Sequence, residues 1–254
     1  MFILAVDTST PAGSVGVLRY ERVLGVVSTW VAETYSSRIF RHLEFLLSEL
    51  SMKTEQFDLF AVAAGPGSFS GLRVGLAAAK AWSEVHQKPI AAVSALEAVA
   101  LQVGIQGRQE DKQPLIVPMI DARRGQIYAG VYRPISAKGG AIGPGSNGTG
   151  FKGLTRQGDE RVMAAAEFLA TLREQVHDEQ VLFATPTPEI MAEALAASAF
   201  RDSPVVTASP VLAPSIGLLG LAQARRGELV DALHLEANYI RRSDAELVFK
   251  TTRA

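Results

Sequence analysis

Two short stretches of the chain combine residue types that could hold a phosphate group. Residues 65–71 have the sequence Gly-Pro-Gly-Ser-Phe-Ser-Gly and lie between an apolar run and an alanine-rich segment. Glycine permits positive φ angles and close approach to the backbone, and a helix that follows directs free N–H groups outward. We therefore take Gly65, Gly67, Ser68 and Gly71 as candidate phosphate contacts. The alternative is a tight turn that serves packing alone.

The spacing of these glycines excludes two common nucleotide motifs. The dinucleotide fingerprint is Gly-x-Gly-x-x-Gly, whereas residues 65–71 have one residue more before the last glycine. A Walker A loop closes with Gly-Lys-Ser/Thr, which is absent from this stretch. Residues 137–153 are also rich in glycine, but Phe151 separates Gly150 from Lys152 and no strand is expected before them. We predict a flexible loop there.

Asp7, Thr8 and Ser9 follow an apolar run at residues 2–6 and form the second candidate phosphate site. Nucleotide-binding folds often place carboxylates and hydroxyls at the C-terminal end of a strand, where they contact phosphate or magnesium. The alternative interpretation is that Asp7 and Thr8 only cap a turn.

Other catalytic centres find no support in the sequence. The chain has no cysteine, which removes disulfides, thiol nucleophiles and thiolate metal sites. The four histidines, His42, His86, His177 and His234, show no metal-binding spacing. A Gly-x-Ser-x-Gly nucleophile elbow is also missing. We therefore predict neither a metal site nor a serine hydrolase.

The composition indicates a folded chain with little affinity of its own for nucleic acid. Of its 254 residues, 48% are hydrophobic and 20% are charged, which argues against disorder. Lys and Arg number 25 against 26 Asp and Glu, so the basic excess typical of proteins that bind phosphate backbones is absent. Residues 2–6 are too short for a signal peptide, and no apolar run is long enough to span a membrane. A cytoplasmic protein is expected.

Hydrophobic periodicity predicts an α/β chain with two lobes. The first half should contain, in order, strands at 2–6, 14–18 and 23–30, a helix at 37–50, a strand at 57–64, a helix at 72–85, a strand at 89–93 and a helix after Ser94. The second half should contain strands at 115–120 and 126–132, a helix at 164–175, a strand at 181–185, a helix at 188–197, a strand at 205–207 and a helix at 214–227. We place a first lobe at 1–104, a linker at 104–113 and a second lobe at 113–210.

Four segments in this order resemble the bacterial TsaB (YeaZ) family, relatives of the glycoprotease proteins. They are ILAVDTS at 3–9, AGPGSFSGLRVGLAAAKA at 64–81, VSALEA at 93–98 and DARRGQIYAGVY at 121–132, followed more loosely by NYIRRSDAE at 238–246. The resemblance implies the actin-like ATPase fold of sugar kinases and Hsp70, in which each of two lobes carries a mixed sheet flanked by helices. It also implies that the helix at 214–227 packs back on the first lobe.

The same resemblance implies a role in making N6-threonylcarbamoyladenosine beside the anticodon of tRNAs that read codons starting with A. In that family TsaD transfers the threonylcarbamoyl group, TsaB is its scaffold and TsaE supplies an ATPase. TsaD-type proteins carry a metal-binding His-x-x-x-His pair on the helix that matches residues 94–100, where this chain has Ala95 and Val99. Methyl groups cannot bind a metal, so the resemblance implies a non-catalytic subunit.

The resemblance further implies how such a subunit would interact. It would form a homodimer alone, pair with a TsaD-type subunit, recruit a TsaE-type ATPase and meet tRNA only through the complex. It would have no cofactor of its own, although ATP or ADP could bind at the shared interface. No membrane contact is implied.

In that family the pairing surface is built from the two helices at 37–50 and 72–85. Candidate interface residues on them are Ser37, Phe40, Leu43, Leu47, Arg73, Leu76, Ala77 and Lys80. The alanines of the second helix allow close helix approach, although they could instead pack on the chain's own sheet. Ser36 stands where the family often has histidine, which argues against a ligand at this helix start.

Two enzymatic hypotheses remain as alternatives. A small-molecule kinase of the same fold would use Asp7 and the glycine turn around phosphate, but it needs a second-lobe aspartate and an adenosine loop that we do not find. A peptidase is suggested by the family's older names, but it lacks metal ligands and a nucleophile.

Overall fold

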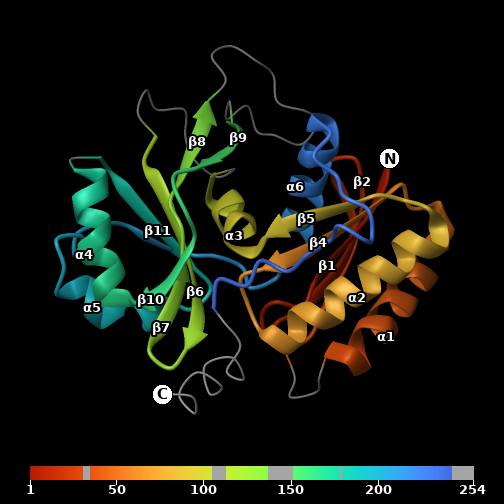
Figure 1. Cartoon of the computed structure of the whole chain (residues 1–254), viewed down its shortest axis with the longest axis horizontal. Coiled ribbons are helices and arrows are strands. Elements are labelled where there is room, and N and C mark those ends of the chain that lie inside the picture. The colour runs from red at the N-terminus through yellow and green to blue at the C-terminus, as the bar shows by residue number, and fades with distance from the viewer. Residues whose placement is uncertain (31–34, 105–112, 137–150, 178, 242–254) are drawn as a thin grey trace, which may run out of the picture.

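The computed structural model describes residues 1–30, 35–104, 113–136, 151–177 and 179–241, which form two lobes, each built on a β-sheet (Figure 1). Helices cover the sheets, and a further helix lies between them. In these parts of the chain, no helix is long and apolar enough to cross a membrane.

The first lobe contains a five-stranded mixed sheet in the order β3-β2-β1-β4-β5. Its elements are β1 (Phe2–Asp7), β2 (Ser14–Arg19), β3 (Arg22–Ser28), α1 (Tyr35–Glu49), η1 (Thr54–Gln56), β4 (Leu59–Gly65), α2 (Phe69–His86) and β5 (Ile90–Ser94). The first three strands form an antiparallel meander, and β4 and β5 then extend the sheet in parallel with β1. Apolar residues of α1 and α2 pack with β1 and β4 in one buried cluster.

The second lobe contains a seven-stranded sheet with the central order β10-β7-β6-β11-β12, and β8 joins it to β9. Its elements are β6 (Leu115–Arg123), β7 (Gln126–Ala129), β8 (Tyr132–Ser136), β9 (Phe151–Arg156), β10 (Arg161–Ala164), α4 (Ala165–Val176), β11 (Val181–Thr185), η2 (Pro188–Ile190), α5 (Ala192–Ala196) and β12 (Val205–Thr207). Helix α4 covers one face of this sheet through Phe168, Leu169 and Leu172.

Two helices join the lobes into one body. Helix α3 (Ala95–Gly104) has eight of its ten residues buried and contacts elements of both sheets. Helix α6 (Ala213–Arg226) lies on the first sheet, where the N–H of Ala213 donates to the Ser14 hydroxyl at 3.0 Å. A single apolar cluster runs from the first sheet through α3 and α6 to β6 of the second. Two lobes, each with a β-sheet flanked by helices, are the architecture expected from the sequence.

The structure corrects the predicted elements mainly in the second lobe. The strand expected at 126–132 is broken at Gly130 into β7 and β8, and β8 through β10 were missed as separate strands. Pro134 cannot donate to a ladder, which hides β8 in a propensity-based assignment. The loop expected at 137–153 includes the first residues of β9, and its remainder at 137–150 lies outside the described residues, as does most of the predicted linker, at 105–112.

Helix α6 approaches the first sheet closely enough that glycine is required at its contact. A Cβ atom on Gly220 would lie 2.8 Å from the Cβ of Ala61 and 3.2 Å from that of Ala91. We expect Gly220→Val to lower the free energy of unfolding by about 1–3 kcal/mol through overpacking, measured by urea denaturation.

The matched control for that change is Arg225→Val, which places the same side chain on the exposed side of the helix. This variant should lose less than about 1 kcal/mol of unfolding free energy, since only an exposed ion pair with Glu21 is broken. Equal losses in the two variants would contradict the packing of α6 on the sheet.

Candidate functional site

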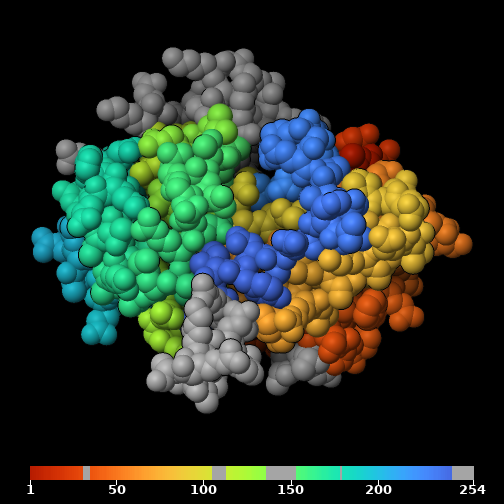
Figure 2. Space-filling model, viewed as in Figure 1, coloured from red at the N-terminus to blue at the C-terminus, as the bar shows by residue number. Residues whose placement is uncertain are grey.

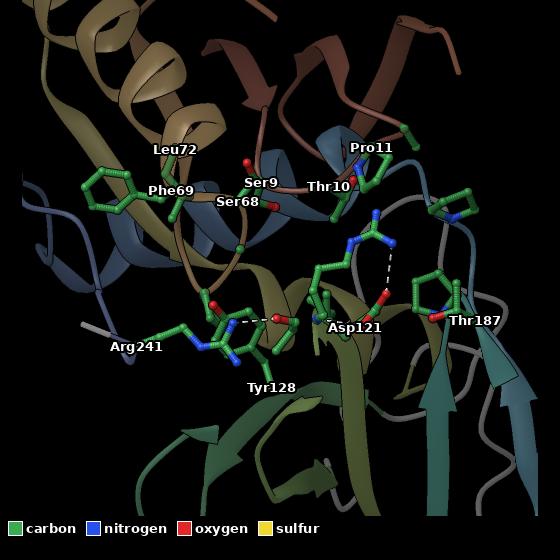
Figure 3. A pocket seen from close by; sticks show the side chains of 18 of the residues that line it. Ser9, Thr10, Pro11, Ser68, Phe69, Leu72, Asp121, Tyr128, Thr187 and Arg241 are labelled. Atoms are coloured by element: carbon green, nitrogen blue, oxygen red, sulfur yellow. Dashed lines mark hydrogen bonds and ion pairs between the residues drawn. The ribbon is translucent and has the colours of Figure 1, made fainter. Parts of the chain in front are cut away.

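A cleft of about 920 Å³ lies between the two lobes. One wall is formed by the turn after β1 and the start of α2, and the other by the hairpin between β6 and β7 (Figure 3). The residues that contribute to these walls include Ser9, Thr10, Ser68, Phe69, Arg73, Asp121, Arg123, Tyr128, Tyr239 and Arg241. The cleft therefore brings together the two stretches that we took as candidate phosphate sites.

Asp7 serves to hold the turn after β1. One of its carboxylate oxygens accepts hydrogen bonds from the N–H and hydroxyl of Ser9, at 2.8 and 2.6 Å, and the other accepts from the Thr10 hydroxyl at 3.1 Å. The carboxyl group is buried, and this desolvation raises its pKa despite the three donors. Of the predicted contacts in this turn, Ser9 lines the cleft, whereas Asp7 and Thr8 do not.

The glycines of the α2 start allow the helix to approach the turn. A Cβ atom on Gly71 would lie 2.0 Å from the carbonyl oxygen of Thr8, and one on Gly67 would lie 2.6 Å from Ser9. Gly75, one helical turn later, would meet the Thr8 hydroxyl at 2.4 Å. Any side chain at these positions would push α2 away from β1.

The N–H groups of Ser68 and Gly71, at this helix start, are bonded within the protein. Ser68 donates its N–H to the Ser9 carbonyl at 2.8 Å, and its hydroxyl caps α2 by accepting from the Gly71 N–H at 3.3 Å. Gly65 has a φ of +127°, a conformation that L residues rarely adopt. The geometry thus gives the turn a packing role and does not favour a phosphate at its occupied donors. Phosphate contact by this turn and by Asp7, Thr8 and Ser9 stays a prediction.

Arginines and aromatic rings line the cleft, and of these we foresaw only Arg73, which we took as an interface residue. The Arg73 guanidinium lies 3.9 Å above the centre of the Phe69 ring. Arg123 forms an ion pair with Asp121 at 3.2 Å, and Arg241 donates to the Ala122 carbonyl at 2.7 Å. The signals for Arg123 and Arg241 were the DARRGQ and NYIR segments, which entered the sequence analysis only as marks of resemblance.

The predicted interface residues divide into an exposed set and a buried set. Ser37, Phe40, Arg73 and Ala77 are exposed, and Leu47 and Lys80 are half-buried. Leu43 and Leu76 lie in the core between the helices and the sheet, with 4% and 7% exposure. In this chain they support the surface from beneath, because their inward positions on α1 and α2 direct them to the sheet.

Several apolar side chains are exposed on these two helices. Phe40 of α1 lies edge-on to Trp82 of α2, with ring centroids 6.3 Å apart, and 55% of Phe40 is exposed. Val85, at 74% exposure, continues this surface, and Ala77 and Ala81 are exposed on the same helix. We call Phe40, Ala77, Ala81, Trp82 and Val85 the α1/α2 face. Its Ala81, Trp82 and Val85 were not among the predicted residues.

Helix α3 has apolar groups at the positions where TsaD-type proteins were expected to hold a metal. Ala95 and Val99 are both fully buried in the core shared by the lobes. Within the described ranges, no group of histidine, aspartate and glutamate side chains is arranged to hold a metal ion.

The family model for tRNA N6-adenosine threonylcarbamoyltransferase, TsaD, matches residues 18–147, just over half of the chain. The chain belongs to the TsaD family. It is 38% identical over 133 residues to the tRNA threonylcarbamoyladenosine biosynthesis protein TsaB of Bacillus subtilis, covering 52% of this chain and 56% of that protein. TsaB of Haemophilus influenzae is 32% identical over 126 residues, or 50% of this chain and 51% of that protein. The chain thus spans about half the length of the curated relatives it matches.

The fold of the family is seen over nearly the whole chain. A crystal structure of an uncharacterised Pseudomonas aeruginosa protein with similarity to peptidase YeaZ aligns with a TM-score of 0.73. The alignment covers 94% of this chain and 99% of that one at 24% identity. The resemblance to TsaB (YeaZ) proteins that the sequence motifs indicated is therefore confirmed.

The buried carboxyl group of Asp7 predicts a specific pH dependence. Folding raises the pKa of Asp7 above the ordinary value of 3.8. Between pH 3.8 and the raised pKa, the folded chain therefore holds more protons than the unfolded chain. The contribution of Asp7 to the free energy of unfolding therefore falls as pH rises through this window. We expect Asp7→Asn, which cannot ionise, to gain stability relative to the wild type over the same pH rise.

Chemical denaturation of both proteins from pH 3.5 to pH 7 measures this difference. A difference in unfolding free energy that stays constant with pH would contradict a raised pKa for Asp7.

Proposed function

We propose that this chain is a scaffold subunit required for threonylcarbamoyl transfer to the adenosine beside the anticodon of tRNAs that read ANN codons. It acts by dimerising with a TsaD-type catalytic subunit. Membership of the TsaD family and the TsaB names of the matched relatives support the pathway. The α1/α2 face, an exposed apolar surface on a folded chain, is the observation that carries the pairing role.

The chemistry of α3 supports a non-catalytic role. Ala95 and Val99 offer only methyl groups and are enclosed by the shared core, so a metal could be held there only if both side chains and their packing changed. In the scaffold proposal the partner therefore supplies the transferase centre, and peptidase activity is not expected of this chain.

The remaining partners follow from the same proposal. The pair formed with the TsaD-type subunit recruits a TsaE-type ATPase, and tRNA meets this chain only through the complex. In the absence of its partner the chain forms a homodimer through the same face. It has no cofactor of its own, and ATP or ADP binds, if at all, where the subunits meet.

The alternative, a small-molecule kinase of the same fold, finds less support in the geometry. A kinase would need the Asp7 carboxylate available to a metal or a substrate. Here both oxygens of that carboxylate accept hydrogen bonds from its own turn, and the group lies behind the cleft wall. The family membership also favours the scaffold.

A pair of substitutions on neighbouring residues of α2 tests the pairing surface. Ala77 is exposed, so Ala77→Arg should leave the free energy of unfolding within about 0.5 kcal/mol of the wild type. The same change places a charged side chain in the contact, so pairing with the TsaD-type subunit should weaken at least about tenfold. Calorimetric titration of one subunit with the other measures this affinity.

Ala78→Arg provides the contrast, because Ala78 is buried with 5% exposure against the sheet. An unpaired charge there should cost more than about 3 kcal/mol and unfold the chain, as circular dichroism would show. Normal pairing by folded Ala77→Arg would refute the proposed surface.

A further inference from the structure

The C-terminal segment that follows α6 crosses from the first lobe to the second. Figures 1 and 2 show it, in dark blue, at the surface between α2 and the second sheet. It starts beside β5, where Val230 and Ile90 exchange backbone hydrogen bonds of 2.8 and 2.9 Å. It reaches the second lobe at Arg241, which donates to the Ala122 carbonyl and to the Gln126 side chain of the β6–β7 hairpin.

Asn238 attaches the segment to both lobes at once. Its N–H donates to the Ala64 carbonyl, in β4 of the first sheet, at 2.7 Å. Its side-chain amide donates to Glu160, just before β10, at 3.1 Å. Gly65 makes this crossing possible, because a Cβ atom there would lie 2.5 Å from the Asn238 carbonyl oxygen.

Glu160 gathers donors from both lobes into one buried carboxylate. The Tyr132 hydroxyl of β8 donates to it at 2.5 Å, and the Ser94 hydroxyl at the end of β5 donates to the same oxygen. With the Asn238 amide on the other oxygen, three donors surround a side chain that is only 8% exposed. Hydrogen bonds to a charged acceptor are among the stronger ones in proteins, so this contact resists separation of the lobes.

The next residue fixes the segment to the start of α2. Tyr239 stacks on Phe69 with ring centroids 5.1 Å apart, and its hydroxyl accepts from Arg73 at 3.3 Å. Ile240 is half-buried against the core cluster that spans the lobes. Tyr239 thus fixes the segment to the first lobe, and the contacts of Asn238 with Glu160 and of Arg241 with Ala122 would be lost or strained if the lobes moved apart.

We propose that residues 238–241 form an interlobe link, a segment that holds the two lobes together and sets the width of the cleft between them. Asn238, Tyr239 and Arg241 also line that cleft, so the residues of the interlobe link form part of the cleft wall. This inference does not rest on the scaffold role, because it concerns the chain alone. It assigns a physical purpose to the NYIR segment.

The absence of cysteine allows a direct test by spin labelling. Cysteines replace Glu55 in the first lobe and Glu174 on α4, both exposed, and nitroxide labels are attached to them. Double electron–electron resonance on the full chain, diluted with unlabelled protein, then gives the distribution of interlobe distances. We expect one narrow peak in the parent chain, and its loss with a shift to longer distances in Asn238→Ala and in Arg241→Ala.

The control is Leu233→Ala, which should keep the narrow peak. Leu233 lies on the same segment but is 80% exposed and outside the interlobe link. Circular dichroism checks that each variant is folded. If Arg241→Ala fails to fold, Arg241→Lys replaces it, because lysine keeps the charge but not the planar fork that reaches both acceptors. A narrow, unshifted peak in the folded Asn238 and Arg241 variants would overturn the proposal.

Discussion

The burial of α3 between the two sheets is the constraint on which the rest of the structure depends. A helix with eight buried residues out of ten must be enclosed by apolar groups from more than one side. Here the first sheet, β6 and β9 of the second lobe and α6 provide them. The lobes therefore share one core, and the cleft opens only where that core ends. The same enclosure leaves Ala95 and Val99 in an apolar environment that suits support and not metal chemistry.

Close approach between the backbones of α2 and the turn after β1 is a second constraint on the fold. The glycine turn looks like a phosphate loop in sequence, yet Gly67, Gly71 and Gly75 are required because α2 lies directly against the turn after β1. That contact fixes the direction of α2 and hence the orientation of the α1/α2 face. The close approach at the glycine turn thus serves to position a surface. The Asp7 carboxylate and the N–H groups of Ser68 and Gly71 are bonded to neighbouring residues of the same chain, whereas the buried Thr8 hydroxyl has no hydrogen-bond partner among the described residues.

The first lobe was largely predictable, because the periodicity of β1 to β3, α1 and α2 is regular and each element ends at a clear turn or cap. The second lobe was less so, since Pro134 and the break at Gly130 conceal β8, Lys152 and Gly153 interrupt the apolar pattern of β9, and β10 has only four residues. The sequence did not show that Leu43 and Leu76 are buried while Phe40 is exposed, because helical spacing alone does not say which apolar residues face the sheet. The side-chain contacts of Asn238, Tyr239 and Arg241 were hidden because they join segments 78 or more positions apart.

The central claim is that this chain enables a modification that it does not itself catalyse. The most direct measurement is an omission assay, in which tRNA is incubated with the TsaD-type and TsaE-type proteins, ATP and a supply of threonylcarbamoyl-adenylate, with and without this chain. Mass spectrometry of the digested tRNA quantifies N6-threonylcarbamoyladenosine. We predict modification only when the chain is present together with its partners, and none from the chain alone. Equal modification without the chain, or modification by the chain alone, would contradict the account.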